Sequence, residues 1–219
     1  MSLFPIISPA AALGPVVITQ TDESISTPNT TVYTYSSQAI GTASDDRLVV
    51  VVTSSDHASS IVSTMTIGGD SMTKWFEVTD PPASFWYRAV SSGTTAEIIV
   101  TWTVTVGNNQ IGVYAVTGAS TTLHDTASGR PGSGTAPTTT IDVAANGGVI
   151  GSSFVDYGTY TWNAWVGITK DYDQKSENSN TSAAHDEFTA AETGRTITAT
   201  PSSLTSNNLA VTVISLAPG

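Results

Sequence analysis

The sequence predicts an all-β protein, an antiparallel β-sandwich of jelly-roll type. Short apolar runs rich in β-branched residues recur along the 219-residue chain. Turns rich in Gly, Asn, Pro and Ser separate these runs, and hydroxyl side chains replace most of the long charged ones. Both features are typical of strands joined by tight turns, and they predict roughly ten to twelve strands.

The composition indicates a globular chain with a substantial core. Hydrophobic residues make up 39% of the sequence, and charged residues 11%, against about 25% in ordinary globular domains. Pro9 and Pro15 prevent a helix near the start. We therefore expect an extended N-terminal arm over residues 1–15. One β-sandwich domain is expected over residues 16–219, with a long loop near 127–140. No internal repeat is evident.

Individual runs predict individual strands. RLVVVVTS (47–54) is continuously apolar and β-branched, as expected of a strand covered on both faces. EIIVTWTVTV (97–106) alternates, which predicts Val100, Trp102, Val104 and Val106 on one buried face. LAVTVISL (209–216) predicts a further strand near the C-terminal end. The best helix candidate is SAAHDEFTAAE (182–192), one short helix at most.

The stretch TMTIGGDSMTK (64–74) could be a catalytic loop or a turn. Its flanks alternate, and a Gly-Gly pair between alternating strands supplies the positive φ angles of a tight hairpin. Asp70 has no other carboxylate near it in the sequence. We interpret Gly68-Gly69-Asp70 as a turn, and Asn146-Gly147-Gly148 as a second one.

Charge and residue usage exclude several classes of partner. The formal net charge is −11, and the seven basic residues are scattered, so nucleic-acid binding is not expected. No apolar stretch approaches about 18 residues, so no membrane span is expected. The absence of cysteine excludes disulfides and thiolate metal sites.

One polar segment is a candidate calcium site. KDYDQKSE offers Asp171, Asp173 and Glu177 in one polar segment, which suits a loose calcium site. Lys175 and Ser176 stand where an EF-hand loop needs an oxygen ligand and a glycine. We expect a solvated loop there, and no metal or cofactor.

Three histidines each adjoin an acid, and mixed imidazole and carboxylate groups suit metals. The pairs are far apart in sequence and are interpreted as surface groups; they are Asp56-His57, His124-Asp125 and His185-Asp186.

Nothing in the sequence predicts catalysis. No G-x-S-x-G nucleophile motif is present. Two carboxylates across a cleft could hydrolyse a glycoside, but eighteen acidic residues single out no pair. Exposed tryptophans could stack on sugars, although buried core positions explain most tryptophans in a sandwich. The candidates are Trp75, Trp86, Trp162 and Trp165. We expect a protein that is not an enzyme.

A run of strand-and-turn phrases resembles β-sandwich structural proteins of tailed-phage virions. The phrases include AIGTASDDRLVVVVTSS (39–55), TIGGDSMTK (66–74), VSSGTTAEIIVTWT (90–103) and IGVYAVTG (111–118). VAANGGVIGSSF and LAVTVISLAPG fit the same pattern. The resemblance covers most of residues 30–217 and includes no catalytic motif, so no functional residue is carried over from it.

The resemblance implies a virion component, and we expect a capsid cement or decoration protein on the outer capsid surface. Its partners would be the major capsid protein and itself, as a homotrimer. The expected contact residues are Phe4, Ile6 and Ile7 of the apolar arm. Two alternatives stay open: a tail or head-fibre module that binds host glycans, and a carbohydrate-active enzyme.

Overall fold

The structure is a computed structural model, and it describes residues 14–57, 59–132, 134–156, 160–176, 179–205 and 208–219. These residues form seventeen strands and no helix, and the strand pairs are antiparallel. The predicted antiparallel β-sandwich class is therefore confirmed, with more strands than expected. The jelly-roll order of strands stays a prediction. The described residues contain no helix that could cross a membrane.

The first half of the chain forms two sheets, here called A and B. Sheet A contains, in spatial order, β1 (Val17–Ser26), β9 (Asn109–Thr117), β3 (Leu48–Ser55), β7 (Pro82–Ala89) and β6 (Thr73–Thr79). Sheet B contains β2 (Thr30–Ala39), β8 (Thr95–Val106), β4 (Val62–Ile67) and the short β5 (Asp70–Ser71).

The second half forms sheets C and D. Sheet C contains, in spatial order, β10 (Ala119–Gly129), β17 (Leu209–Pro218), β12 (Gly147–Asp156), β15 (Ser179–Phe188) and β14 (Thr169–Lys175). Sheet D contains β11 (Thr138–Val143), β16 (Glu192–Pro201) and β13 (Trp162–Val166).

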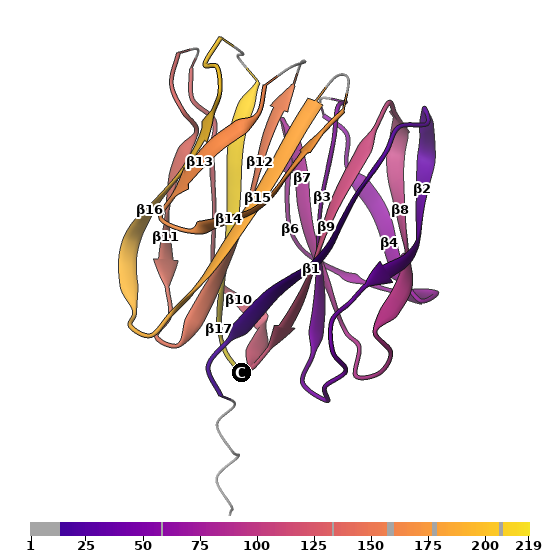
Figure 1. Cartoon of the computed structure of the whole chain (residues 1–219), viewed down its shortest axis with the longest axis vertical. Coiled ribbons are helices and arrows are strands. Elements are labelled where there is room, and N and C mark those ends of the chain that lie inside the picture. The colour runs from indigo at the N-terminus through magenta and orange to yellow at the C-terminus, as the bar shows by residue number, and fades with distance from the viewer. Residues whose placement is uncertain (1–13, 58, 133, 157–159, 177–178, 206–207) are drawn as a thin grey trace, which may run out of the picture.

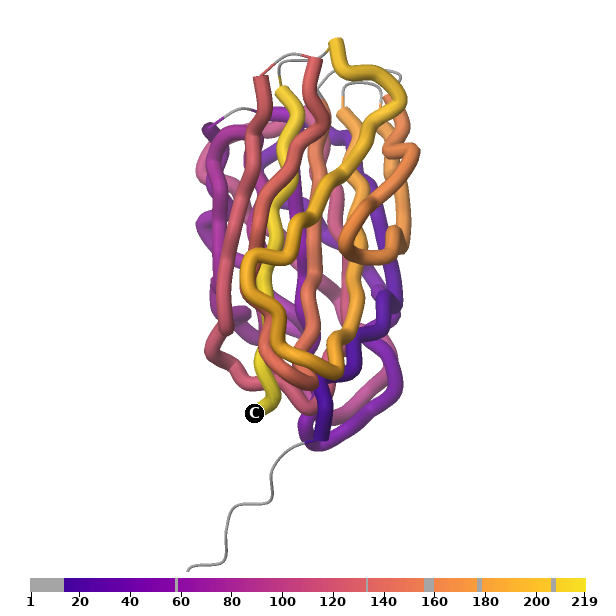
Figure 2. The backbone as a smooth tube through the Cα atoms, turned by 90° about the vertical axis from the view of Figure 1, so that its left-hand side faces the viewer, coloured from indigo at the N-terminus to yellow at the C-terminus, as the bar shows by residue number. Residues whose placement is uncertain are grey.

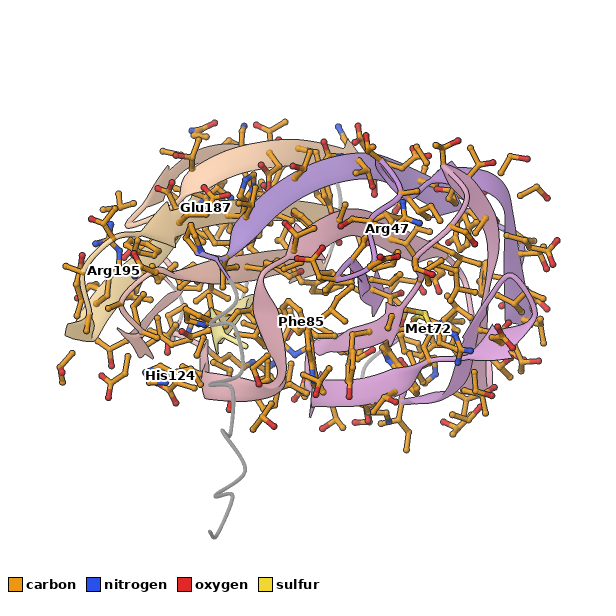
Figure 3. All side chains as sticks on the ribbon, turned by 90° about the horizontal axis from the view of Figure 1, so that it is seen from below. Arg47, Met72, Phe85, His124, Glu187 and Arg195 are labelled. Carbon is orange, nitrogen blue, oxygen red and sulfur yellow. The ribbon has the colours of Figure 1, made fainter. Side chains whose placement is uncertain are left out.

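The four sheets stack in four layers, in the order B, A, C, D (Figure 1). Figure 2 shows the strands running along the long axis of the molecule. One core lies between B and A, around Trp102 and Val113, and another between C and D, around Trp162 and Val213. A third core joins A to C and includes Phe85 and Tyr114 of sheet A. Figure 3, from below, places Phe85 in this middle layer.

The two halves have the same topology. Replacing β1, β9, β3, β7 and β6 of sheet A by β10, β17, β12, β15 and β14 reproduces sheet C in the same spatial order. Likewise, β2, β8 and β4 of sheet B correspond to β11, β16 and β13 of sheet D. The chain is thus a structural duplication whose equivalent sheets, A and C, pack against each other. No repeat is evident in the sequence itself.

Several sequence predictions of burial can now be checked. Every residue of β3 is buried, as predicted for a strand covered on both faces. Val100, Trp102 and Val106 are buried as predicted, whereas Val104 is 40% exposed. The pairing of β2 with β8 jumps from Val32↔Thr101 to Thr30↔Val106. This irregularity in the ladder breaks the period-2 alternation, so Val104 turns outward.

The helix candidate at 182–192 was wrong. Its first seven residues belong to β15, which pairs with β12 along its whole length. Ala183 and Ala184 are fully buried, one toward each neighbouring core. Tertiary packing between two layers here overrides the helical preference of alanine.

The two predicted turns differ in what they join. Gly68 and Gly69 have φ angles of 58° and 86°, and they connect the paired strands β4 and β5 as predicted. Asn146, with φ 55°, leads from β11 of sheet D to β12 of sheet C. The second turn therefore joins two layers and is not a hairpin. In the predicted long loop, β10 extends to Gly129 and β11 begins at Thr138.

Close packing of sheet A on sheet C generates the first testable prediction. A Cβ atom on Gly112 of β9 would overlap the Tyr172 hydroxyl of β14. Gly112→Ala should therefore lower the free energy of unfolding by about 1–3 kcal/mol, measured by urea denaturation. Gly132→Ala is the matched control, because nothing lies within 4 Å of its added Cβ. Equal stability of the two variants would contradict this close approach.

Candidate functional site

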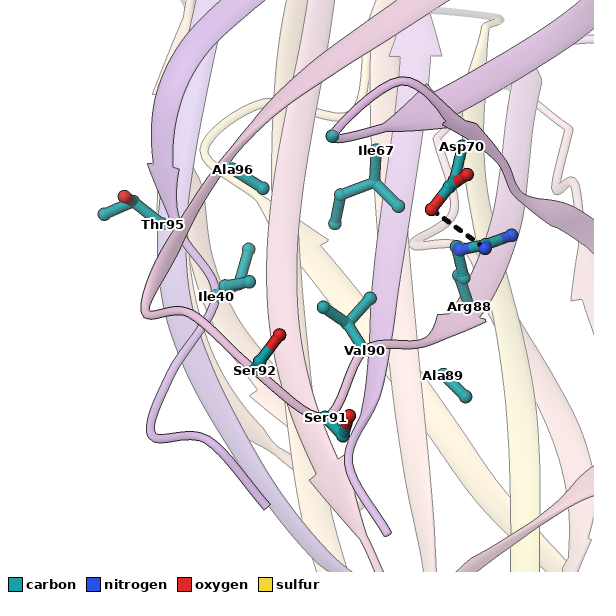
Figure 4. A pocket seen from close by; sticks show the side chains of 11 residues that line it. Ile40, Ile67, Asp70, Arg88, Ala89, Val90, Ser91, Ser92, Thr95 and Ala96 are labelled. Carbon is teal, nitrogen blue, oxygen red and sulfur yellow. Dashed lines mark ion pairs between the residues drawn. The ribbon is translucent and has the colours of Figure 1, made fainter. Parts of the chain in front are cut away.

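A cavity of about 360 Å³ opens at one end of the first sandwich, between sheets A and B. Its lining is mixed, and Figure 4 shows aliphatic side chains beside polar ones. The aliphatic residues are Ile40, Ile67, Val90 and Ala96, and the polar ones include Asp70, Arg88, Ser91, Ser92 and Thr95. Its size falls within the range of small-ligand pockets. This cavity, here called the end pocket, is the candidate site.

The Gly68-Gly69 turn shapes one wall of the end pocket. It places Asp70 at the mouth, where Asp70 Oδ2 lies 3.0 Å from Arg88 Nη2 (Figure 4). Arg88 Nη1 also donates to the Ser71 carbonyl, at 2.8 Å. The Asp70 and Arg88 side chains are 67% and 36% exposed, so the ion pair is solvated and contributes little to stability. The mouth therefore has two solvated charges of opposite sign.

A buried arginine holds the two loops that border the end pocket. Arg47 is 1% exposed and lies inside the first half (Figure 3). Its Nε donates to the Val90 carbonyl at 2.7 Å, and its other nitrogens donate to four further carbonyls. These acceptors are Ile40, Gly41, Ser92 and Gly93. Burial lowers the pKa of Arg47. The β2–β3 and β7–β8 loops are thus fixed to one another by a single side chain.

A second cluster of titratable groups lies where sheet C meets sheet A. Asp171 Oδ2 accepts a 2.9 Å hydrogen bond from the Tyr114 hydroxyl, and Asp171 Oδ1 lies 2.7 Å from His185 Nδ1. Burial raises the pKa of the Tyr114 phenol. Burial alone would lower the pKa of His185, but Asp171, Glu187 and Asp186 outweigh it and raise that pKa. This cluster is a polar link between the two halves.

The predicted calcium ligands Asp171 and Asp173 do not lie together in the part of the chain that the structure describes. Asp171 points toward sheet A, where it meets Tyr114. Asp173 points the other way, toward sheet D, where it accepts a hydrogen bond from the Trp162 amide. A register shift in β14 between Lys170 and Tyr172 puts the two carboxylates on opposite sides. Glu177 lies outside the described residues, and no group of three metal-ligating side chains occurs within them.

The other predicted site residues are also dispersed. Phe4, Ile6 and Ile7 lie outside the described residues. Asp56 accepts the amides of Gly107 and Asn108, so it fixes a turn. His57 follows β3, His124 lies in β10 and His185 lies in β15, so the three histidines are on different elements.

Arg47 and Arg88 were not among the site residues predicted from the sequence. Arg47 immediately precedes the all-buried strand β3, and a charged residue at that boundary is the signal that could have pointed to a buried guanidinium. Arg88 gave no such signal, because its partner Asp70 comes from another hairpin.

Comparison with known proteins gives no relative: no family model, curated protein or solved structure matches the chain. The site is therefore interpreted from its own geometry.

The Arg47 network generates the second prediction. Arg47→Met should lower the free energy of unfolding by about 3 kcal/mol, because five backbone carbonyls lose a charged donor. Arg88→Met is the control and should cost less than about 1 kcal/mol, since it breaks an exposed pair. Urea denaturation of both variants measures the difference, and a similar small loss in both would contradict the clamping role of Arg47.

The His185 cluster generates the third prediction, a dependence of stability on pH. A raised pKa in the folded chain means that protonated His185 stabilises the fold fully below its unfolded pKa of about 6.5. That contribution is lost as the pH rises through the folded value. His185→Gln should therefore lose more unfolding free energy at pH 6 than at pH 9.

Urea denaturation at both pH values tests this prediction. His124→Gln is the control, because the His124 side chain is exposed. An equal loss for His185→Gln at pH 6 and pH 9 would show that the charge of the imidazole does not matter.

Proposed function

We propose that this chain is a non-enzymatic structural protein of a phage virion, a decoration protein that joins neighbouring capsid subunits. The observation that carries the proposal is the duplication. It gives the molecule two outer sheets of the same topology, B and D, which face away from each other at opposite sides (Figure 1). A protein with two related faces suits a partner that presents one surface many times.

The outward side of sheet B is here called the B face, and its central rows consist of uncharged side chains. Cross-strand rows connect Val32 to Thr101 and Thr64, and Thr34 to Ile99 and Thr66. Val32 is 47% exposed. None of these six side chains is charged, so a partner could cover them without removing an ion from water.

The outward side of sheet D, here the D face, repeats this chemistry. Thr138 pairs with Thr198, which also pairs with Val166. Thr140 pairs with Thr196 in the next row. Val166 is the most exposed large apolar side chain among the described residues, at 58%. Both outer faces thus combine threonine hydroxyls with β-branched methyl groups.

The tryptophans favour decoration over the fibre alternative. A glycan-binding fibre needs aromatic rings exposed on one rim. Trp86, Trp102 and Trp162 are buried. Trp75 stacks on Tyr87 at 4.2 Å between ring centroids, and Trp165 donates to the Ser182 hydroxyl. The described residues offer no aromatic platform for a sugar.

The end pocket gives no support to the glycosidase alternative. Such an enzyme needs two carboxylates that face each other across a cleft. Among the residues that line the end pocket, only Asp70 carries a carboxylate, and it is paired with Arg88.

Co-sedimentation with expanded, undecorated capsids of the parent phage tests the proposal. The unmodified chain should bind saturably. Thr101→Lys on the B face should weaken binding about a hundredfold, and Thr198→Lys on the D face should weaken it by a similar factor. Each added charge prevents one face from binding, so the gain in affinity from two-point attachment is lost. The double variant should not bind. Thr189→Lys, in an exposed turn outside both faces, is the control.

Three results would count against the proposal. Normal binding by both single variants would exclude the two faces as contacts. Loss in Thr189→Lys as well would point to a general charge effect. If the unmodified chain does not co-sediment, a host-glycan screen becomes the next test. The expected homotrimer is checked separately, by light scattering of the purified chain.

A further inference from the structure

Strand register gives an internal comparison for the end pocket, because it aligns the two halves with each other. Val49 of β3 lies in the first core and pairs with Arg88 of β7. Val149 of β12 lies in the core between sheets C and D and pairs with Asp186 of β15. The equivalent strands β7 and β15 are therefore aligned on Arg88 and Asp186.

The second half fills the space that the first half leaves open. Two residues beyond the aligned pair, Val90 corresponds to Phe188. Ala96 likewise corresponds to Arg195, since each precedes a buried isoleucine of β8 or β16 by two residues. The Arg195 guanidinium lies over the Phe188 ring, 4.4 Å from its centroid, at the outer side of the second half (Figure 3). Valine and alanine are much smaller than this pair, so the equivalent space in the first half is not filled.

The end pocket has an aliphatic side and a charged side. The aliphatic side consists of residues that belong to the first core or pack against it, namely Ile40, Ile67, Val90 and Ala96. Asp70 and Arg88 stand together on the other side (Figure 4), and both are exposed enough to meet a ligand from water. The end pocket therefore suits a ligand that has an apolar part and a charged part.

The shape of the end pocket is fixed before any ligand binds. Arg47 holds the β2–β3 and β7–β8 loops together through five backbone carbonyls. These loops supply Ile40 and Val90 to the lining. A site that is already shaped loses little conformational freedom on binding, and this favours affinity for a small ligand.

The charges at the mouth select the class of ligand. Asp70 and the net charge of −11 repel an anion, and Arg88 repels a cation. No aromatic ring is among the described residues that line the end pocket, so a sugar has no ring on which to stack. A zwitterion meets neither repulsion, because it has no net charge and offers each mouth residue a group of opposite sign.

We propose that the end pocket binds a free α-amino acid with a large apolar side chain. Its carboxylate pairs with Arg88 and its ammonium group with Asp70, both as charge-assisted hydrogen bonds. Its side chain lies against Val90 and Ala96, in the space that the second half fills. The exposed Asp70–Arg88 pair costs little to separate. This binding goes beyond the capsid role, since the end pocket lies between sheets A and B and not on an outer face.

Isothermal titration calorimetry of the full chain with L-leucine and with L-phenylalanine tests the proposal. At least one of the two should bind saturably. Two analogues separate the charges of leucine: isocaproate lacks the ammonium group, and isoamylamine lacks the carboxylate. Each should bind at least about tenfold more weakly than leucine, because one charged hydrogen bond is lost. Glucose, which has no charge, should not bind.

Two pairs of variants test the location. Arg88→Met should weaken amino-acid binding at least about tenfold, whereas Lys175→Met, which removes an exposed basic residue outside the end pocket, should leave the affinity unchanged. Val90→Phe copies the second half and should abolish binding, whereas Val166→Phe, at an exposed valine of sheet D, should not. Urea midpoints show which variants are folded, and the Arg88 pair decides the location if Val90→Phe does not fold.

Four results would overturn the proposal. The first is no binding of either amino acid by the unmodified chain. The second is equal binding of leucine and of either analogue, which would show that the paired charges do not matter. The third is binding of glucose in place of an amino acid. The fourth is an equal effect of Arg88→Met and Lys175→Met, which would place binding outside the end pocket.

Discussion

The contact between sheets A and C is the constraint on which the rest of the structure depends. These two sheets are covered on both faces, so their central strands cannot alternate between apolar and polar residues. β3 meets this demand with a run of valines, and β17 with two sets of aliphatic side chains, one for each core. Where the layers come closest, glycine replaces a side chain, as at Gly112 beneath Tyr172. The outer sheets have one buried face each and are free to be polar outside.

This constraint also explains how much of the fold could be predicted. The continuous run of β3 and the Gly68-Gly69 turn are local signals, and both were interpreted correctly. β15 was misread, because its polar and alanine-rich residues form a strand only between β12 and β14. The seam between the halves uses hydroxyl contacts such as Ser54 with Thr181, 127 residues apart. Sequence patterns within a short window do not record such partners.

The duplication was invisible for a related reason. Equivalent positions need side chains of suitable volume that point in the same direction, but they do not need the same residue type. The two halves therefore fill equivalent positions with different residues. Val90 and Ala96 correspond to Phe188 and Arg195, and no pattern of residue types connects them. The end pocket is a product of this divergence. The candidate site could not be predicted from the sequence, because it arises where the two halves differ. The relation between the halves is itself visible only in the order of their strands.

The distribution of charge links the fold to the proposed role. The chain carries a net charge of −11, whereas the paired rows described on the B face and the D face consist of Thr, Val and Ile. The exposed carboxylates Glu97 and Asp142 lie further along the same strands. Acidic groups such as Asp46, Asp56 and Asp125 instead accept backbone amides at turns and strand edges. An acidic protein is repelled by other anionic surfaces, while these uncharged rows can be covered at little cost in desolvation. Stacking equivalent sheets back to back puts those faces on opposite sides. The same packing therefore stabilises the chain and positions the two faces that we propose as contacts.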